Sequence, residues 1–118
     1  MRKRIEKAWC KETAHPSYQK DWTPNNPSYG QCCVTALLVQ EKVGGEIYSC
    51  RVRGYNNTHY INIINDRIID LTAKQFGGIS GITYLNYSFK IKDRKALLKN
   101  KSVKERYELL KKRYEEVI

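Results

Sequence analysis

The sequence predicts a single α+β domain, on the evidence of one strongly apolar helical segment, the alternating strand segments that follow it and a polar helical segment at the end. A chain of 118 residues falls within the usual size range of one domain. Hydrophobic residues make up 41% of it, which is enough to build a core. We expect the core in residues 16–91 and a basic helical segment in residues 92–118.

The first half of the chain predicts two helices separated by a loop. Apolar residues recur at helical spacing in residues 2–13, and Pro16 is expected to end that helix because the residue before a proline is disfavoured in helical geometry. Residues 16–30 contain all three prolines and predict a loop. Residues 31–43 are apolar nearly all the way round, which is typical of a helix covered on several sides, and Gly44 provides its end.

A small antiparallel sheet is predicted next. Residues 46–53 alternate between apolar and polar, as a half-buried strand does. Residues 60–64 and 67–71 predict a hairpin, because Asn65 and Asp66 between them are suited to a tight two-residue turn.

The rest of the chain predicts one more strand and three helices. Thr72 and Gln75 form a capping-box pattern that starts a short helix at Ala73 and ends it by Gly77-Gly78. Residues 82–91 predict a further strand. Helices are expected over 93–100 and 102–117, the second started by Ser102 with Glu105 three residues on.

The net charge of +10 is concentrated at the end of the chain. Within residues 90–118, Lys111, Lys112 and Arg113 are the candidate contacts to nucleic acid or an acidic partner. The alternating charges, with Glu108 placed four residues before Lys112, equally fit a solvated helix face.

Composition also bears on compartment and cofactors. No apolar run approaches the ~20 residues of a membrane span, and the first residues lack the apolar stretch of an export signal, so we expect a cytoplasmic protein without membrane contact. Four cysteines without an export signal are expected to be free thiols. With no C-x-x-C pair and two isolated histidines, neither a metal site nor a cofactor is expected.

Cys32 is the candidate nucleophile. It falls in the first turn of the helix over residues 31–43, where the helix dipole and unpaired N–H groups favour a thiolate and can hold an oxyanion. Cys10, Cys33 and Cys50 are interpreted as small buried hydrophobes. Trp22 and Tyr29, in the preceding loop, either pack that loop or line a cleft.

His59 and Asp70 are the candidate partners of Cys32. A two-residue turn at 65–66 pairs Ile61 with Asp70 and makes His59 and Asp70 diagonal neighbours on one face of the hairpin. Asp70 would then orient the imidazole, leaving its other nitrogen free to take a proton from Cys32. His15, beside a proline in a loop, is discounted because it has no such partner.

Several motifs resemble known families. A cysteine opening a buried helix, a strand that starts with histidine and a strand that ends in Asp-x-Thr resemble the core of transglutaminase-like and arylamine-acetyltransferase-like papain-fold proteins. A second set of motifs lies within residues 22–76 and consists of Trp22, Pro27-Ser28-Tyr29-Gly30-Gln31-Cys32, Thr35-Ala36, Gly44-Gly45, His59-Tyr60-x-Asn62 and Ile69-Asp70-Leu71-Thr72-x-x-Gln75-Phe76. These residues more closely resemble the YunG-like family of small bacterial and phage proteins.

The papain-fold resemblance implies Cys32 as nucleophile, His59 as general base and acid, and Asp70 as the residue that orients it. It also implies Gln31 as an oxyanion donor, beside the N–H of Cys32. Asn62 is a further candidate binding residue. The YunG-like resemblance supports the fold and implies no particular reaction.

Three functions follow from these expectations. The first is thiol-dependent acyl transfer at an amide or ester, by hydrolysis, deamidation or transfer, with a peptide or amide as the candidate substrate. The second is a non-catalytic binding module that contacts nucleic acid or an acidic partner through its basic C-terminal helix. The third is a purely structural role in which the nine tyrosines serve packing or oligomer contacts. The substrate and the oligomeric state are not encoded in these patterns.

Overall fold

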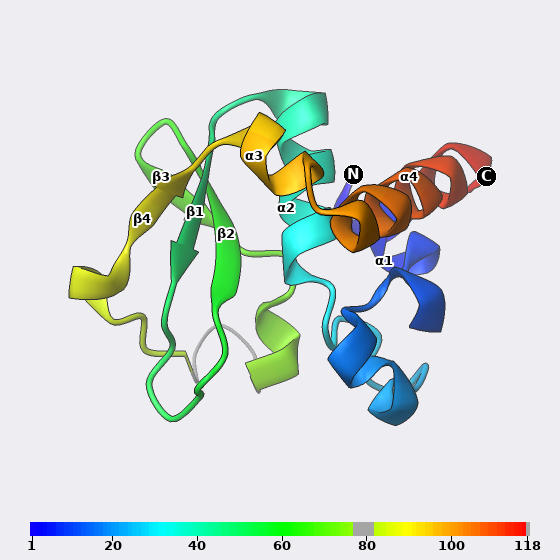
Figure 1. Ribbon diagram of the computed structural model, residues 1–118, viewed down its shortest axis with the longest axis horizontal. Helices are drawn as coiled ribbons and strands as arrows, with labels where there is room; N and C mark the ends of the chain where they lie inside the picture. Colours follow the sequence, from blue (N-terminus) through cyan, green and yellow to red (C-terminus); the bar gives the residue numbers. More distant parts are fainter. Residues whose placement is uncertain (77–81, 118) are drawn as a thin grey trace.

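The computed structural model describes residues 1–76 and 82–117 and has an α+β architecture in three layers. A four-stranded antiparallel sheet of order β3-β2-β1-β4 forms one outer layer, helix α2 the middle, and helices α1 and α4 the other side (Figure 1). The helices are α1 (Arg2–Ala8), α2 (Cys32–Val43), α3 (Arg94–Leu98) and α4 (Lys101–Glu116). The strands are β1 (Glu46–Cys50), β2 (His59–Ile64), β3 (Arg67–Ile69) and β4 (Lys90–Lys92).

Helix α2 is the innermost element. It contacts β2 on one side and α4 on the other, so its side chains are buried all round, as the apolar segment predicted. Val34, Leu37 and Leu38 have no exposed surface. The helix ends at Gly44, whose φ of +81° is a conformation that favours glycine.

The β2–β3 hairpin has the predicted two-residue turn. Ile64 pairs with Arg67, and Asn65 and Asp66 between them have φ of 51° and 64°. Asn and Asp tolerate positive φ better than most residues. Continued beyond β3, this register brings Asp70 opposite Ile61, two positions from His59 and on the same face of the hairpin.

The predicted helix over residues 2–13 is wrong at its end. Helix α1 stops at Ala8, Trp9 is extended with ψ of 141°, and a separate 3₁₀ helix, η1 (Lys11–Thr13), follows. The Trp9 indole Nε1 donates to Thr35 Oγ1 at 2.9 Å, and this long-range bond to α2 fixes the break. The expected loop over 16–30 contains another 3₁₀ helix, η2 (Pro16–Asp21).

The predicted strand over residues 82–91 is also largely wrong. Only β4 is a strand there, preceded by a 3₁₀ helix, η5 (Asn86–Ser88). The Ser88 hydroxyl accepts from the Arg51 N–H at 2.8 Å, where a strand would supply a backbone carbonyl. The predicted strand over 46–53 accordingly ends at Cys50, with one isolated bridge between Val52 and Tyr84 beyond it.

The last predicted helices form with shifted ends. Asn100 caps α4 through a bond from the Val103 N–H to its Oδ1 at 3.1 Å, so Ser102 is not the cap. The 3₁₀ helix η3 (Ala73–Phe76) starts where the capping box predicted, and its expected end at Gly77-Gly78 lies outside the described residues.

One hydrophobic core joins the layers. It contains fully buried Ile5 from α1 and Leu110 from α4 together with Leu37 and Ile47. Both ends of the chain therefore contribute to the core, beyond the 16–91 range expected for it.

Residues 1–76 and 82–117 contain neither a membrane-spanning helix nor a cluster of metal-ligating side chains. No helix there has both the length and the apolar character needed to cross a bilayer. No group of three or more His, Cys, Asp or Glu side chains is placed to hold a metal ion.

Candidate active site

His59 and Asp70 form a buried ion pair at the open end of the β2–β3 hairpin. His59 Nε2 lies 2.7 Å from Asp70 Oδ2, and both side chains are almost fully buried. Asp70 also accepts from the Thr72 N–H at 3.2 Å, the Thr72 hydroxyl at 3.3 Å and the Tyr84 hydroxyl at 2.6 Å. The contact between His59 and Asp70 predicted from the hairpin register is confirmed.

The pair stabilises its own charges. Burial by itself lowers the pKa of His59, but the bond to Asp70 and the nearby Cys32 thiol more than offset this and raise that pKa to about 9. Burial raises the pKa of the Asp70 carboxyl, and the bonds from His59, Tyr84 and Thr72 outweigh it and hold this pKa below its ordinary value. At neutral pH the pair is therefore imidazolium and carboxylate.

The second ring nitrogen of His59 is left for Cys32. His59 Nδ1 is buried and makes no hydrogen bond of normal geometry within the described ranges. Cys32 is half-buried and lines the same cavity as His59, with a volume of about 190 Å³. The cavity wall is largely aromatic and is completed by Tyr18, Tyr29, Tyr55, Asn57, Thr58, Gln75 and Phe76.

Cys32 also lies at the start of α2. The first backbone bond of that helix runs from the Thr35 N–H to the Gln31 carbonyl, so the N–H groups of Cys32, Cys33 and Val34 come before any intrahelical partner. Such groups are suited to bind an oxyanion formed at the Cys32 sulfur.

The thiols of Cys33 and Cys50 are in a different environment. Burial raises the pKa of each to about 12, so both stay protonated at neutral pH. Cys32 therefore differs from them in placement, although it is adjacent to Cys33 in sequence.

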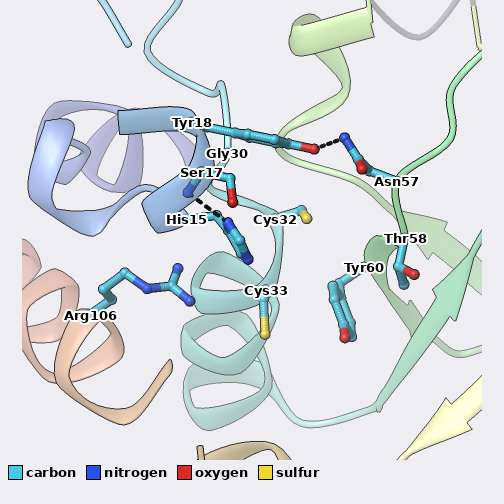
Figure 2. Close-up of a pocket in the computed structure, with 10 residues that line it drawn as sticks. All are labelled: His15, Ser17, Tyr18, Gly30, Cys32, Cys33, Asn57, Thr58, Tyr60 and Arg106. Atoms are coloured by element: carbon cyan, nitrogen blue, oxygen red, sulfur yellow. Dashed lines mark hydrogen bonds between the residues drawn. The ribbon is translucent and has the colours of Figure 1, made fainter. Parts of the chain in front are cut away.

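Tyr18 and Asn57 close over Cys32. The Asn57 side-chain amide donates to the Tyr18 hydroxyl, so η2 is joined to the loop between β1 and β2 across the sulfur (Figure 2). Tyr18 is further held by stacking on Tyr29, with ring centroids 4.8 Å apart. Two cavities meet at Cys32 and share this bridge in their walls.

The Gln31 side chain, predicted as an oxyanion donor, is hydrogen-bonded to Thr13 and Cys10 instead. Gln31 has no exposed surface, its Oε1 accepts from the Thr13 hydroxyl at 2.7 Å, and its Nε2 donates to the Cys10 carbonyl at 2.9 Å. These bonds fasten the start of α2 to η1. The backbone N–H groups of α2 are the better oxyanion donors.

The other expected binding residues are mostly occupied in holding the fold. Trp22 Nε1 donates to the Pro27 carbonyl at 3.0 Å and braces its own loop. Asn62 Nδ2 donates to the Ala36 carbonyl at 2.9 Å and ties the sheet to α2. Only Tyr29 of this group lines a cavity that contains Cys32.

Comparison with known proteins identifies the family. A family model described as YunG protein matches residues 1–118. The chain belongs to the YunG family. It is 36% identical over 72 residues to a protein of Bacillus subtilis (strain 168) named "Uncharacterized protein YunG", a match that covers 61% of this chain and 56% of that relative. No solved structure matches.

The basic end of this YunG-family chain is partly engaged in internal contacts. Lys111 pairs with Glu41 of α2 at 3.1 Å, and Arg113 Nε donates to the Ala8 carbonyl at 2.6 Å. Lys112 is exposed. Contact of this helix with nucleic acid or an acidic partner stays a prediction.

Sequence reasoning missed four residues of the site. Tyr84 was assigned to a strand, Tyr18 and Asn57 to loops, and Arg106 to a solvated helix face. All four reach the site through contacts between segments far apart in the chain. Among these segments, the sequence indicated a cleft only for the loop over residues 16–30, through Trp22 and Tyr29, and that pattern does not distinguish packing from binding.

Proposed function

We propose that this protein is a thiol-dependent acyl-transfer enzyme that acts on an amide or ester bond. Cys32 is the nucleophile, His59 the general base and acid, and Asp70 the residue that orients His59. The observation that carries this proposal is the buried His59–Asp70 pair at 2.7 Å, because His59, whose Nδ1 has no hydrogen-bond partner among the described residues, lines the same cavity as Cys32.

The chemistry proceeds in two halves. Cys32 sulfur attacks the substrate carbonyl carbon, its proton residing on His59, and the carbonyl oxygen becomes an oxyanion beside the N–H groups that begin α2. The bond to the amine or alcohol then breaks, and that leaving group takes the proton from His59. Water or an acceptor amine then attacks the thioester and gives its proton to His59; the carbon–sulfur bond breaks, the product leaves, and Cys32 and protonated His59 return to their starting state.

The arrangement of elements supports the same proposal. A nucleophile at the start of a buried helix, followed along the chain by His and Asp on neighbouring antiparallel strands, is the order implied by the papain and transglutaminase resemblance. We propose that relationship on this order of elements and residues alone. The overall fold shown is α+β.

Selective alkylation tests the proposed nucleophile. The four thiols are treated with limiting iodoacetamide at neutral pH, and modification is mapped by peptide mass spectrometry over time. We expect Cys32 to react at least about tenfold faster than Cys33 and Cys50, whose pKa of about 12 keeps them protonated.

A second measurement tests acyl transfer itself. Incubation with p-nitrophenyl acetate should acetylate Cys32, with release of p-nitrophenol. The C32S and H59Q variants should lose this burst, while C10S, altered at a half-buried cysteine away from the pair, should keep it. Equal alkylation of all four thiols, or an acetylation burst that survives C32S, would overturn the proposal.

A further inference from the structure

The second cavity at Cys32 differs in chemistry from the aromatic one. It lies on the other side of the Tyr18–Asn57 bridge, has a volume of about 290 Å³ and is bounded by α2, α4 and the start of η2 (Figure 2). No acidic side chain is among the described residues that line it, whereas Arg106 and His15 are. Its wall therefore carries positive charge and hydrogen-bond donors without a matching carboxylate.

Arg106 is the main source of that charge. Its side chain points from α4 into this cavity (Figure 2), and the residue is only 7% exposed. Its Nε donates to the Ser102 hydroxyl at 3.1 Å, and within residues 1–76 and 82–117 no carboxylate lies within 4.0 Å of it. Arg106 also lines a second hollow, which it shares with Glu12 and Glu105, but neither carboxylate comes within ion-pair distance of it. A buried guanidinium without an anion is costly and is suited to bind one.

His15 adds a directed donor. Its Nδ1 accepts from the Ser17 N–H at 3.1 Å, which leaves the ring proton on Nε2. That nitrogen points into the cavity, on the same side as the Arg106 guanidinium (Figure 2). Burial and the charge of Arg106 lower the pKa of His15, so the ring is neutral at pH 7 and acts as an N–H donor.

We propose that this cavity binds a carboxylate of the substrate, held by the Arg106 guanidinium and the His15 Nε2–H beside the bond that Cys32 attacks. This inference rests on the proposed function, because it names the substrate class of the same site. One cation and one neutral donor balance the single charge of a carboxylate, whereas a phosphate dianion would lack a second cation. The aromatic cavity on the other side of Cys32 then takes the less polar part of the substrate.

Paired alkylating reagents test this charge preference. Iodoacetate and iodoacetamide react alike: the thiolate sulfur attacks the CH₂ carbon, a C–S bond forms and iodide leaves with the electron pair. Only iodoacetate carries a carboxylate. We measure the ratio of the two rates at Cys32 and divide it by the same ratio for glutathione.

We expect the normalised ratio of the iodoacetate rate to the iodoacetamide rate at Cys32 to be about 10 or more, because a desolvated guanidinium attracts the carboxylate. R106Q should bring it close to one, H15Q should lower it partly, and R106K should retain part of it. K104Q removes an exposed charge from the same helix and should leave the ratio unchanged. The same ratio is measured at Cys10, which shows how much the net positive charge of the whole chain by itself favours iodoacetate.

The outcomes separate the two proposals. Equal alkylation of the four thiols refutes the nucleophile. Selective alkylation of Cys32 with a normalised ratio near one refutes the carboxylate pocket alone. Since R106Q could unfold, its thermal melt is recorded, and protection of wild-type Cys32 from iodoacetamide by succinate is measured as well. Protection by inorganic phosphate and not by succinate would overturn the choice of carboxylate.

Discussion

Asp70 illustrates how much of the site depends on a single carboxylate. Its two oxygens accept from His59, Tyr84 and both donors of Thr72, at distances between 2.6 and 3.3 Å. Asp70 therefore holds β2, the end of β3 and the segment around Tyr84 together, in addition to orienting the imidazole. Burial raises the pKa of the Tyr84 hydroxyl, and its bond to Asp70 raises that pKa further. The hydroxyl therefore stays protonated and donates to Asp70.

Replacing Asp70 by Asn should lower the pKa of His59 from about 9, because the change removes the negative charge and the carboxylate hydrogen bond that raise it. NMR titration of the His59 ring protons measures this change. If the proposed mechanism holds, acylation of Cys32 should fall about a hundredfold or more. D66N, in the exposed hairpin turn, is the matched control and should change neither quantity.

The same pair makes stability depend on pH. His59 has a folded-state pKa raised above its ordinary 6.5, so its contribution is fully present below pH 6.5 and is lost as pH rises through about 9. Asp70 has a lowered pKa, so its contribution is lost only in acid. The free energy of unfolding of the wild type should decline from pH 6.5 to 9, and D70N should flatten that decline. A wild-type curve flat over this range contradicts the raised pKa of His59.

At this scale the sequence predicted one contact well. The Asn65-Asp66 turn sets the register, and the register determines that His59 meets Asp70. It could not predict Arg106, because that residue lies 36 positions after Asp70 in the chain and only tertiary packing brings α4 to Cys32.

At the scale of elements, the Tyr18–Asn57 bridge joins two segments that border both cavities at Cys32. One partner comes from η2 and the other from the loop that precedes β2, and both are surface segments. Since the bridge forms part of the wall of both cavities, a substrate long enough to occupy both has to pass beneath it or part it.

Replacing Asn57 by Ala should favour large reagents. We expect the ratio of Cys32 rates with N-phenylmaleimide and N-methylmaleimide to rise about twofold to tenfold, the equivalent of one hydrogen bond. Both reagents are neutral, so the comparison reports access and not charge. N56A, a change at the exposed neighbouring residue, should leave the ratio unchanged. An unchanged ratio in N57A would mean that the bridge does not restrict access.

The misplaced element ends have a common physical cause. Local patterns predict where a helix or strand can form, but side-chain bonds to distant backbone decide where it stops. Trp9 binds α2 and ends α1, and Ser88 binds Arg51 and replaces a strand by η5. Helix α2, by contrast, was predicted to within one residue because its apolar character is continuous.

At the scale of the whole molecule, the chain closes on itself through α1 and α4. Arg4 Nε donates to the Tyr114 carbonyl at 2.7 Å, so the first helix is tied to the last. The basic charge of α4 predicted a solvated or ligand-binding helix. In the structure, α4 also has an apolar stripe through which it packs on α2, and the charge pattern did not indicate this stripe. The α+β class, in contrast, followed from the order of the segments.

Replacing Leu110 by Ala should destabilise the entire fold. Leu110 is fully buried in the shared core, and such a truncation costs about 2–5 kcal/mol. Chemical denaturation measures the change, and L109A, one residue earlier on the half-exposed side, should cost clearly less. Equal, small effects of the two variants would indicate that α4 is an appendage.

The burial of α2 on every side limits how this scaffold can diversify. Its buried residues, Val34 to Val39, cannot be exchanged freely to shift the sulfur, since they pack between the sheet and α4. New selectivity has to arise from the rim instead, in η2, in the loop before β2 and on the inward surface of α4. If the proposed reaction holds, members of the family that differ in preferred substrate should therefore share the residues around Cys32, His59 and Asp70 and differ in these surrounding segments.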